Sequence, residues 1–140
     1  MRLIWALDHN LQLTSKRMAT TMGLTGPQRI VIRLLGQFPG ISAGSLALML
    51  HVHPSTLTGV LKRLETRGLI WRNVDPRDGR RALLGLTAEG RQLDVPAQGT
   101  VEAAIEAGLS KLAPEKLAAA AETLGEISRA LADQLGPQAA

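Results

Sequence analysis

Residues 42 to 90 read SAGSLALMLHVHPSTLTGVLKRLETRGLIWRNVDPRDGRRALLGLTAEG, and this stretch decides the fold. It predicts a short helix from Ser42 to Leu50, because Ser42 is a good cap and apolar residues follow at helical spacing. His51-Val52-His53 forms the turn to a second helix, which Pro54 opens and Gly68 ends. Two helices joined by a tight turn indicate a helix-turn-helix. The first helix is expected to direct three side chains inward: Leu46, Met49 and Leu50.

Two runs with strand character follow, LIWRNV (69–74) and RALLGL (81–86). The segment between them, DPRDGR (75–80), is rich in turn formers and charge. We therefore predict an antiparallel hairpin whose loop is too long and too basic to be only a turn.

The rest of the chain is predicted to be helical, so the fold class is mainly α, with about six helices and one small hairpin. Thr25 and Gln28 form a capping-box pattern at the start of one helix. The remaining helices are expected over Leu3–Met22, from Thr25 to Pro39-Gly40, from Thr87 to about Leu109 with a kink at Pro96, and from Pro114 to about Leu135, where Gly136-Pro137 ends the last one.

The composition excludes several classes of protein. The 140 residues contain no cysteine, so there is no disulfide framework, thiol switch or cysteine-based metal site. No apolar run approaches the roughly 20 residues that span a bilayer, and the first ten residues, MRLIWALDHN, do not read as a signal peptide. We expect a cytoplasmic protein with no membrane partner.

Charge is distributed unevenly along the chain. Up to Leu86 there are twelve basic and four acidic residues, whereas from Thr87 on there are four basic and eight acidic ones. A basic segment of this kind favours a polyanionic partner, although many solvated surfaces show the same asymmetry.

The helix that begins at Pro54 has two different faces when its residues are placed at 100° intervals. Leu57, Val60, Leu61 and Leu64 fall on one side, and the opposite side is small and polar at its start and basic further along. Short hydroxyl side chains let a helix enter the major groove and touch base edges, while lysine and arginine neutralise phosphates. The candidate DNA-binding residues of this helix are Pro54, Ser55, Thr56, Thr58, Gly59, Lys62 and Arg63.

Gly59 is informative because a glycine inside an exposed helix costs about 1 kcal/mol relative to alanine. Close approach to a DNA surface would justify this cost. An ordinary amphipathic surface helix with a tolerated glycine is the alternative.

The hairpin loop adds the basic residues Arg77, Arg80 and Arg81, with Asp75 among them. An arginine at a loop tip can enter a minor groove, where the negative potential is strongest. Asp75 is placed to orient the guanidinium of Arg77 through a bidentate pair. The alternative is a charged turn with a surface salt bridge, which contributes little. Its position just after the candidate recognition helix favours a DNA-binding wing.

Two segments together, PSTLTGVLKRLETRGLI (54–70) and DPRDGRRALLGLTAEG (75–90), resemble the MarR family of bacterial transcription regulators. The second segment matches the wing pattern of that family: Asp-x-Arg, further basic residues, a hydrophobic strand and then Leu-Thr-x-x-Gly. The matching residues are Asp75, Arg77, Arg80, Arg81, Leu86, Thr87 and Gly90.

The resemblance implies a homodimer in which two winged helices face successive major grooves of double-stranded DNA. Residues 1–140 would form a single MarR-like domain, with residues 25–90 as the winged helix and residues 1–23 and 91–140 as dimerisation helices. Ser55, Thr56, Thr58 and Gly59 would lie at bases, Lys62 and Arg63 at phosphates, and Arg77 in the minor groove. Such regulators are more often repressors and bind pseudo-palindromic operators.

The resemblance also implies a small aromatic or anionic effector, bound in a cleft near the dimer helices. Residues placed to line it are Trp5, Lys16, Arg29 and Arg33. No cofactor is expected.

The sequence departs from the family pattern at two points. His53 stands where a helix cap is commonly Ser, Thr or Asp, so either it bonds a phosphate or the cap is Ser55. The absence of cysteine excludes the peroxide-sensing branch of the family. His51 and His53 do not form a zinc pattern, and no catalytic motif occurs. The hypotheses are therefore a DNA-binding regulator and, as the alternative, a MarR-like protein–protein interaction module.

Overall fold

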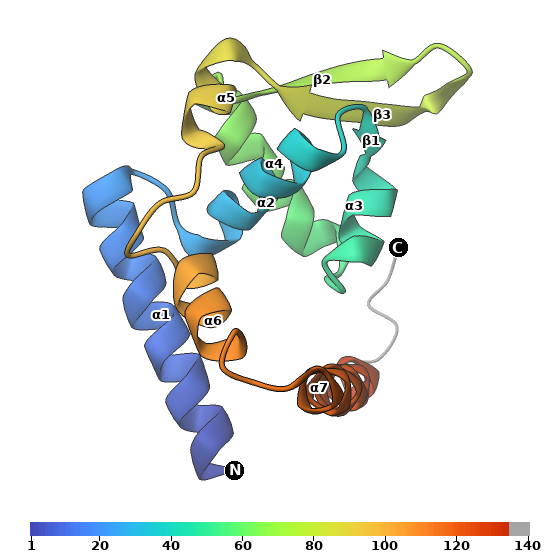
Figure 1. Ribbon diagram of the computed structural model, residues 1–140. Helices are drawn as coiled ribbons and strands as arrows, with labels where there is room; N and C mark the ends of the chain where they lie inside the picture. The colour runs from blue at the N-terminus through green and yellow to red at the C-terminus, as the bar shows by residue number, and fades with distance from the viewer. Residues whose placement is uncertain (135–140) are drawn as a thin grey trace. The chain divides into compact units, whose positions relative to one another are not determined.

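The structure is a computed structural model that describes residues 1–134 (Figure 1). It divides into two units, Met1–Ala103 and the residues from Ala104 on, which are treated separately below. The first unit begins with α1 (Arg2–Met22), which ends as predicted at Gly23 in the left-handed conformation, with φ of 69°.

α2 (Gly26–Gln37) begins with the predicted capping box. Gln28 N donates to Thr25 Oγ1 at 3.4 Å, and Thr25 N donates to Gln28 Oε1 at 3.0 Å. Gly26 N donates to Ser15 Oγ at 2.8 Å, which joins the start of α2 to α1.

The helix-turn-helix consists of α3 (Ala43–Met49) and α4 (Pro54–Thr66). Ser42 caps α3 as predicted, since its hydroxyl accepts the amide of Ser45 at 3.1 Å. The prediction that Met49 faces inward is wrong: its side chain is 41% exposed, and Ala47 is buried next to Leu46 instead. The short α3 buries only the part of its surface that meets α4 and the sheet.

The sheet contains a strand that the sequence did not predict. β1 (Ile41–Ser42) pairs with β3 (Asp78–Leu86), and β3 pairs with β2 (Ile70–Asp75), all antiparallel in the order β1-β3-β2. A strand of two residues is too short to show an alternating pattern. Its partners, Leu83 and Leu84, lie more than forty positions further along the chain, so no local signal predicts the pairing. The predicted length of the hairpin loop, six residues, is also wrong. Pairing between β2 and β3 continues to Asp75 and Asp78, so only two residues connect the strands.

The core of the first unit lies where α2, α3 and α4 meet the base of the sheet. It is formed by branched and unbranched aliphatic side chains with no aromatic ring: Leu24, Val31, Ile32, Leu35, Leu46, Ala47, Leu57, Leu61, Leu64, Leu69, Ile70, Leu84 and Leu86. The turn of the β2–β3 hairpin extends past β1, away from the core (Figure 1). This core therefore fixes α4 and the base of the hairpin relative to each other.

The helix predicted from Thr87 to Leu109 is broken rather than kinked. α5 (Ala88–Leu93) ends at Asp94, and α6 (Val101–Leu109) begins after a non-helical connection. Gly99 takes φ of 75° in this connection, and the Thr100 hydroxyl accepts the amide of Ala103 at 3.2 Å. A new cap therefore starts α6.

The second unit contains the part of α6 from Ala104 on and the whole of α7 (Pro114–Gln134). Neither helix has a buried residue, and Leu124 and Leu131 of α7 are exposed. The predicted helix end at Gly136-Pro137 lies outside the described residues. Within residues 1–134, no helix is both long and apolar enough to cross a membrane.

Candidate nucleic-acid interface

The exposed face of α4 carries the residues that the sequence proposed for base contact. Leu57, Leu61 and Leu64 are buried, which directs the opposite face outward. On that face Pro54, Ser55, Thr56 and Thr58 are exposed and Gly59 is half-buried. The wheel prediction for this helix is confirmed in this respect.

His53 is the N-cap of α4, which decides between the two caps considered from the sequence. Its Nδ1 accepts the amide of Ser55 at 3.3 Å and lies 2.7 Å from Ser55 Oγ. The tautomer of the His53 ring decides which of the two groups donates in the shorter contact.

The hydroxyl group of Thr58 donates a hydrogen bond within the protein. Its Oγ1 donates to the carbonyl oxygen of Pro54 at 2.8 Å, a bond to the preceding helical turn. The methyl group and the lone pairs of Oγ1 remain on the exposed face.

Gly59 has no packing reason inside the protein. A Cβ atom built there meets no heavy atom within 4 Å, and the backbone is ordinary helix. The interior therefore does not require glycine at this position.

A basic surface follows at the C-terminal end of α4. Lys62, Arg63 and Arg67 are exposed and line one shallow hollow together with Gln28 of α2. Arg67 Nη1 donates to the carbonyl oxygen of Gly23 at 2.5 Å, at the end of α1. Arg67 was predicted only as the end of the helix, although its spacing of four from Arg63 places both on one side.

The wing turn is held by aspartates that bind backbone amides. Asp75 Oδ1 accepts Arg77 N at 2.9 Å, and Asp78 Oδ1 accepts Arg80 N at 3.0 Å. The predicted bidentate pair between Asp75 and the Arg77 guanidinium is absent among residues 1–134. Asp75 instead fixes the turn backbone, which leaves the Arg77 side chain exposed. Arg80 and Arg81 lie on β3 rather than in a loop, and the Arg80 side chain is 98% exposed.

Thr87 and Gly90 join the wing to the end of α4. The Thr87 hydroxyl donates to Gly68 O at 2.7 Å and accepts Gly90 N at 3.0 Å. A Cβ atom on Gly90 would lie 1.9 Å from Leu69 O. The Leu-Thr-x-x-Gly pattern thus marks a close approach of α5 to the chain that leaves the recognition helix.

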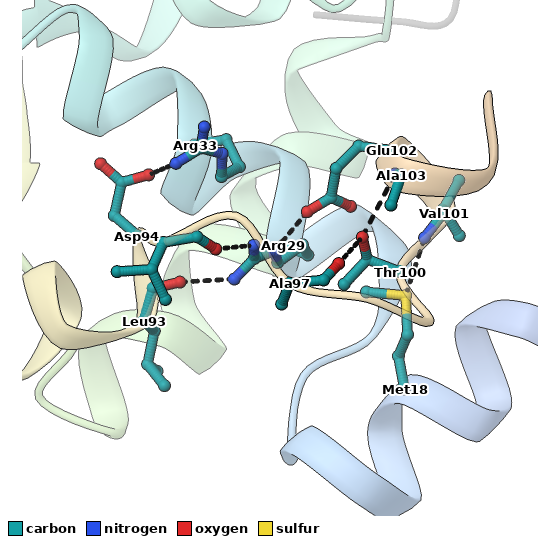
Figure 2. Close-up of polar contacts among 11 residues, drawn as sticks. Met18, Arg29, Arg33, Leu93, Asp94, Ala97, Thr100, Val101, Glu102 and Ala103 are labelled. Atoms are coloured by element: carbon teal, nitrogen blue, oxygen red, sulfur yellow. Dashed lines mark hydrogen bonds and ion pairs between the residues drawn. The ribbon is translucent and has the colours of Figure 1, made fainter. Parts of the chain in front are cut away.

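The four residues proposed for an effector cleft have different surroundings. Trp5 and Lys16 are exposed on α1, with Trp5 at 73%. Arg29 is 1% exposed and donates to the carbonyl oxygens of Leu93 and Val95 and to Glu102 Oε1 (Figure 2). The prediction for Arg29 is therefore wrong, because its donors are already bound within the protein. Arg33 pairs with Asp94.

A different hollow, of about 340 Å³, lies beside Trp71 and Arg91. Leu35, Pro39 and Leu86 supply apolar walls, and Asp94, which pairs with Arg33, also lines the hollow. A Cβ on Gly85 would lie 2.3 Å from the Trp71 ring, so the indole covers that glycine. Arg91 donates one hydrogen bond to Leu86 O at 2.9 Å, and no carboxylate within residues 1–134 pairs with it. This site was not predicted from the sequence, because its lining residues come from segments far apart in the chain.

Comparison with known proteins agrees with this geometry. The MarR family model matches residues 24–82. A helix-turn-helix-type transcriptional repressor of Mycobacterium tuberculosis is 38% identical over 96 residues, which cover 68% of this chain and 69% of the relative.

Two solved structures show the same fold. The PcaV transcriptional regulator from Streptomyces coelicolor, solved with its natural ligand, is 28% identical with a TM-score of 0.74, covering 92% of this chain and 91% of that one. Staphylococcus aureus MepR, solved as a DNA complex, is 23% identical with a TM-score of 0.74, covering 93% of this chain and 96% of that one. The family is one of transcriptional regulators rather than enzymes. The chain belongs to the MarR family.

Proposed function

We propose that this DNA-binding transcriptional regulator represses its target by binding a pseudo-palindromic operator as a homodimer. The observation that carries the proposal is the exposed face of α4, where hydroxyl side chains surround a glycine that the protein interior does not require. A helix with such a face fits the major groove, with its N-terminal residues at base edges. The M. tuberculosis relative is named a repressor, which supports the direction of control.

Each part of the surface has a proposed role. Ser55, Thr56, Thr58 and Gly59 approach bases. Lys62, Arg63 and Arg67 neutralise phosphates, since they are exposed and lie together at the end of α4. Arg77 enters the minor groove from the tip of the wing, with Arg80 and Arg81 along β3.

Dimerisation is supported by exposed apolar residues on helices of both units, which we propose as the dimerisation parts, residues 1–23 and 91–140. α1 exposes Leu3, Trp5 and Leu7, and α7 exposes Leu124 and Leu131. Apolar surface of this extent on a small protein favours cover by another chain, and a two-fold dimer would match a two-fold operator. Half-sites would then lie about one helical turn of DNA apart.

Release by a small effector is the remaining part of the proposal. The hollow beside Trp71 and Arg91 is our candidate in place of the cleft predicted from the sequence, because it has a flat aromatic wall and two charged lining residues, Arg91 and Asp94. Its chemistry suits a planar ligand with a polar group. PcaV, solved with its natural ligand, supports ligand binding by this fold.

A gel-shift experiment with duplex DNA from the region upstream of the protein's own gene tests the function. At low salt, we expect a retarded complex that excess unrelated duplex does not displace. If the folded, dimeric protein gives no shift under these conditions, the DNA-binding proposal is wrong and the alternative, a protein–protein interaction module, replaces it.

A further inference from the structure

One hydroxyl group at the start of the recognition helix, that of Thr58, is already used as a donor within the protein. Thr58 Oγ1 donates its proton to Pro54 O at 2.8 Å. The oxygen therefore presents only lone pairs to the outside. This is a restriction, because a free hydroxyl can either donate or accept.

Major-groove base edges differ in the group that meets such an oxygen. Adenine presents the N6 amino group and cytosine the N4 amino group, which both donate, whereas guanine O6 and thymine O4 accept. An oxygen with a committed proton gains a hydrogen bond from an amino group and repels a keto oxygen. The internal bond of Thr58 therefore converts an unselective hydroxyl into a selective one.

We propose that Thr58 reads an exocyclic amino group, so that each half-site requires adenine or cytosine rather than guanine or thymine at the contacted position of the contacted strand. This inference rests on the proposed function, since it places α4 in a major groove. One base position in each half-site is the expected readout.

Thr66 offers a matched control on the same helix. Its hydroxyl donates to Lys62 O at 2.8 Å, the same bond to the preceding turn that Thr58 makes. It lies eight residues further along, which is about 12 Å in an α-helix. Thr66→Val removes the same internal bond beyond the proposed base-contacting part.

The experiment is selection from a randomised duplex library by the full-length wild type and by Thr58→Val, Thr58→Ser and Thr66→Val. The wild type, Thr58→Ser and Thr66→Val should all retain adenine or cytosine at one symmetry-related pair of positions. Thr58→Val keeps the shape but has no oxygen, so it should lose that preference by about fivefold, the value of one neutral hydrogen bond. An unchanged motif in Thr58→Val, or a wild-type preference for guanine or thymine there, overturns the proposal.

A change in the DNA gives an independent measurement if Thr58→Val selects nothing. The selected duplex is resynthesised with purine, which lacks the N6 amino group, in place of adenine, or with 2-pyrimidinone, which lacks the N4 amino group, in place of cytosine. Wild-type affinity should fall about fivefold. An unchanged affinity overturns the inference, whereas failure of the wild type to select any motif rejects the proposed function itself.

Discussion

Arg29 Nε lies 2.5 Å from Glu102 Oε1, so a guanidinium that is 1% exposed is paired with a carboxylate 73 residues further along the chain. The same guanidinium binds the carbonyl oxygens of Leu93 and Val95 (Figure 2). A buried cation is tolerated only when it is paired and hydrogen-bonded. Arg29 therefore fastens the connection between α5 and α6 to α2.

Glu102→Gln should destabilise the protein, because it leaves the Arg29 charge without a counter-charge. The Glu102 side chain is 38% exposed, so solvent screens part of the pair and we expect a loss of about 1–3 kcal/mol in the free energy of unfolding, a range typical of charged hydrogen bonds. Urea denaturation measures it. Glu106→Gln, on the same helix and outside the pair, should change stability by less than about 0.5 kcal/mol. Equal losses in the two variants would reject the role of the pair.

Gly90→Ala should destabilise the winged helix, since the new Cβ would lie 1.9 Å from Leu69 O. A backbone atom cannot move aside as a flexible side chain can, and we expect a loss of about 2 kcal/mol or more. Thermal unfolding followed by circular dichroism measures the effect. Gly79→Ala in the wing, where a Cβ meets nothing within 4 Å, is the control and should leave the melting temperature nearly unchanged. A stable Gly90→Ala would show that α5 can shift away from Leu69.

Local signals were readable from the sequence and long-range ones were not. The capping box of Thr25 and Gln28, the cap at Ser42 and the helix stops at Gly23 and Gly68 depend on neighbours within a few residues, and all were predicted correctly. β1, in contrast, forms by pairing with the edge of β3, which is distant in the sequence. Arg29 looked like a cleft residue because its partners stand more than sixty positions away.

In the wing, too, one feature was predictable from the sequence and another was not. Its charge pattern correctly indicated a hairpin, but Asp75 was predicted to bind the guanidinium of Arg77, whereas it binds the backbone amide of that residue. An aspartate two residues before an amide forms a local turn at little cost, whereas a side-chain pair must also order a long arginine. The backbone bond therefore forms, and the guanidinium is left for a partner.

Arg77→Ala should weaken DNA binding and lower the slope of log affinity against log salt by about one, because one fewer counterion is released. Titrations between 50 and 200 mM salt, values of the order used for such slopes, measure both quantities. Arg129→Ala on α7 removes the same charge and should leave the slope unchanged. Equal slopes for wild type and Arg77→Ala would place the wing tip away from DNA.

Asp75 gives a second test of the same turn through its bond to the backbone. Asp75→Asn keeps an oxygen that can accept the Arg77 amide, so it should bind DNA nearly as the wild type does. Asp75→Ala removes the acceptor, loosens the turn and should reduce affinity toward that of Arg77→Ala. If Asp75→Asn is as weak as Asp75→Ala, the carboxylate charge matters rather than the bond to the backbone.

Gly59→Ala should separate stability from DNA binding. The position is helical and open, so alanine should raise the free energy of unfolding by about 0.5–1 kcal/mol. The added methyl group would stand where α4 approaches the groove, and we expect DNA affinity to fall at the same time. Gly108→Ala on α6, where the surroundings are equally open, provides the stability reference. A Gly59→Ala protein that is more stable and binds DNA as tightly as the wild type would mean that this face does not enter the groove closely and that the glycine is merely tolerated.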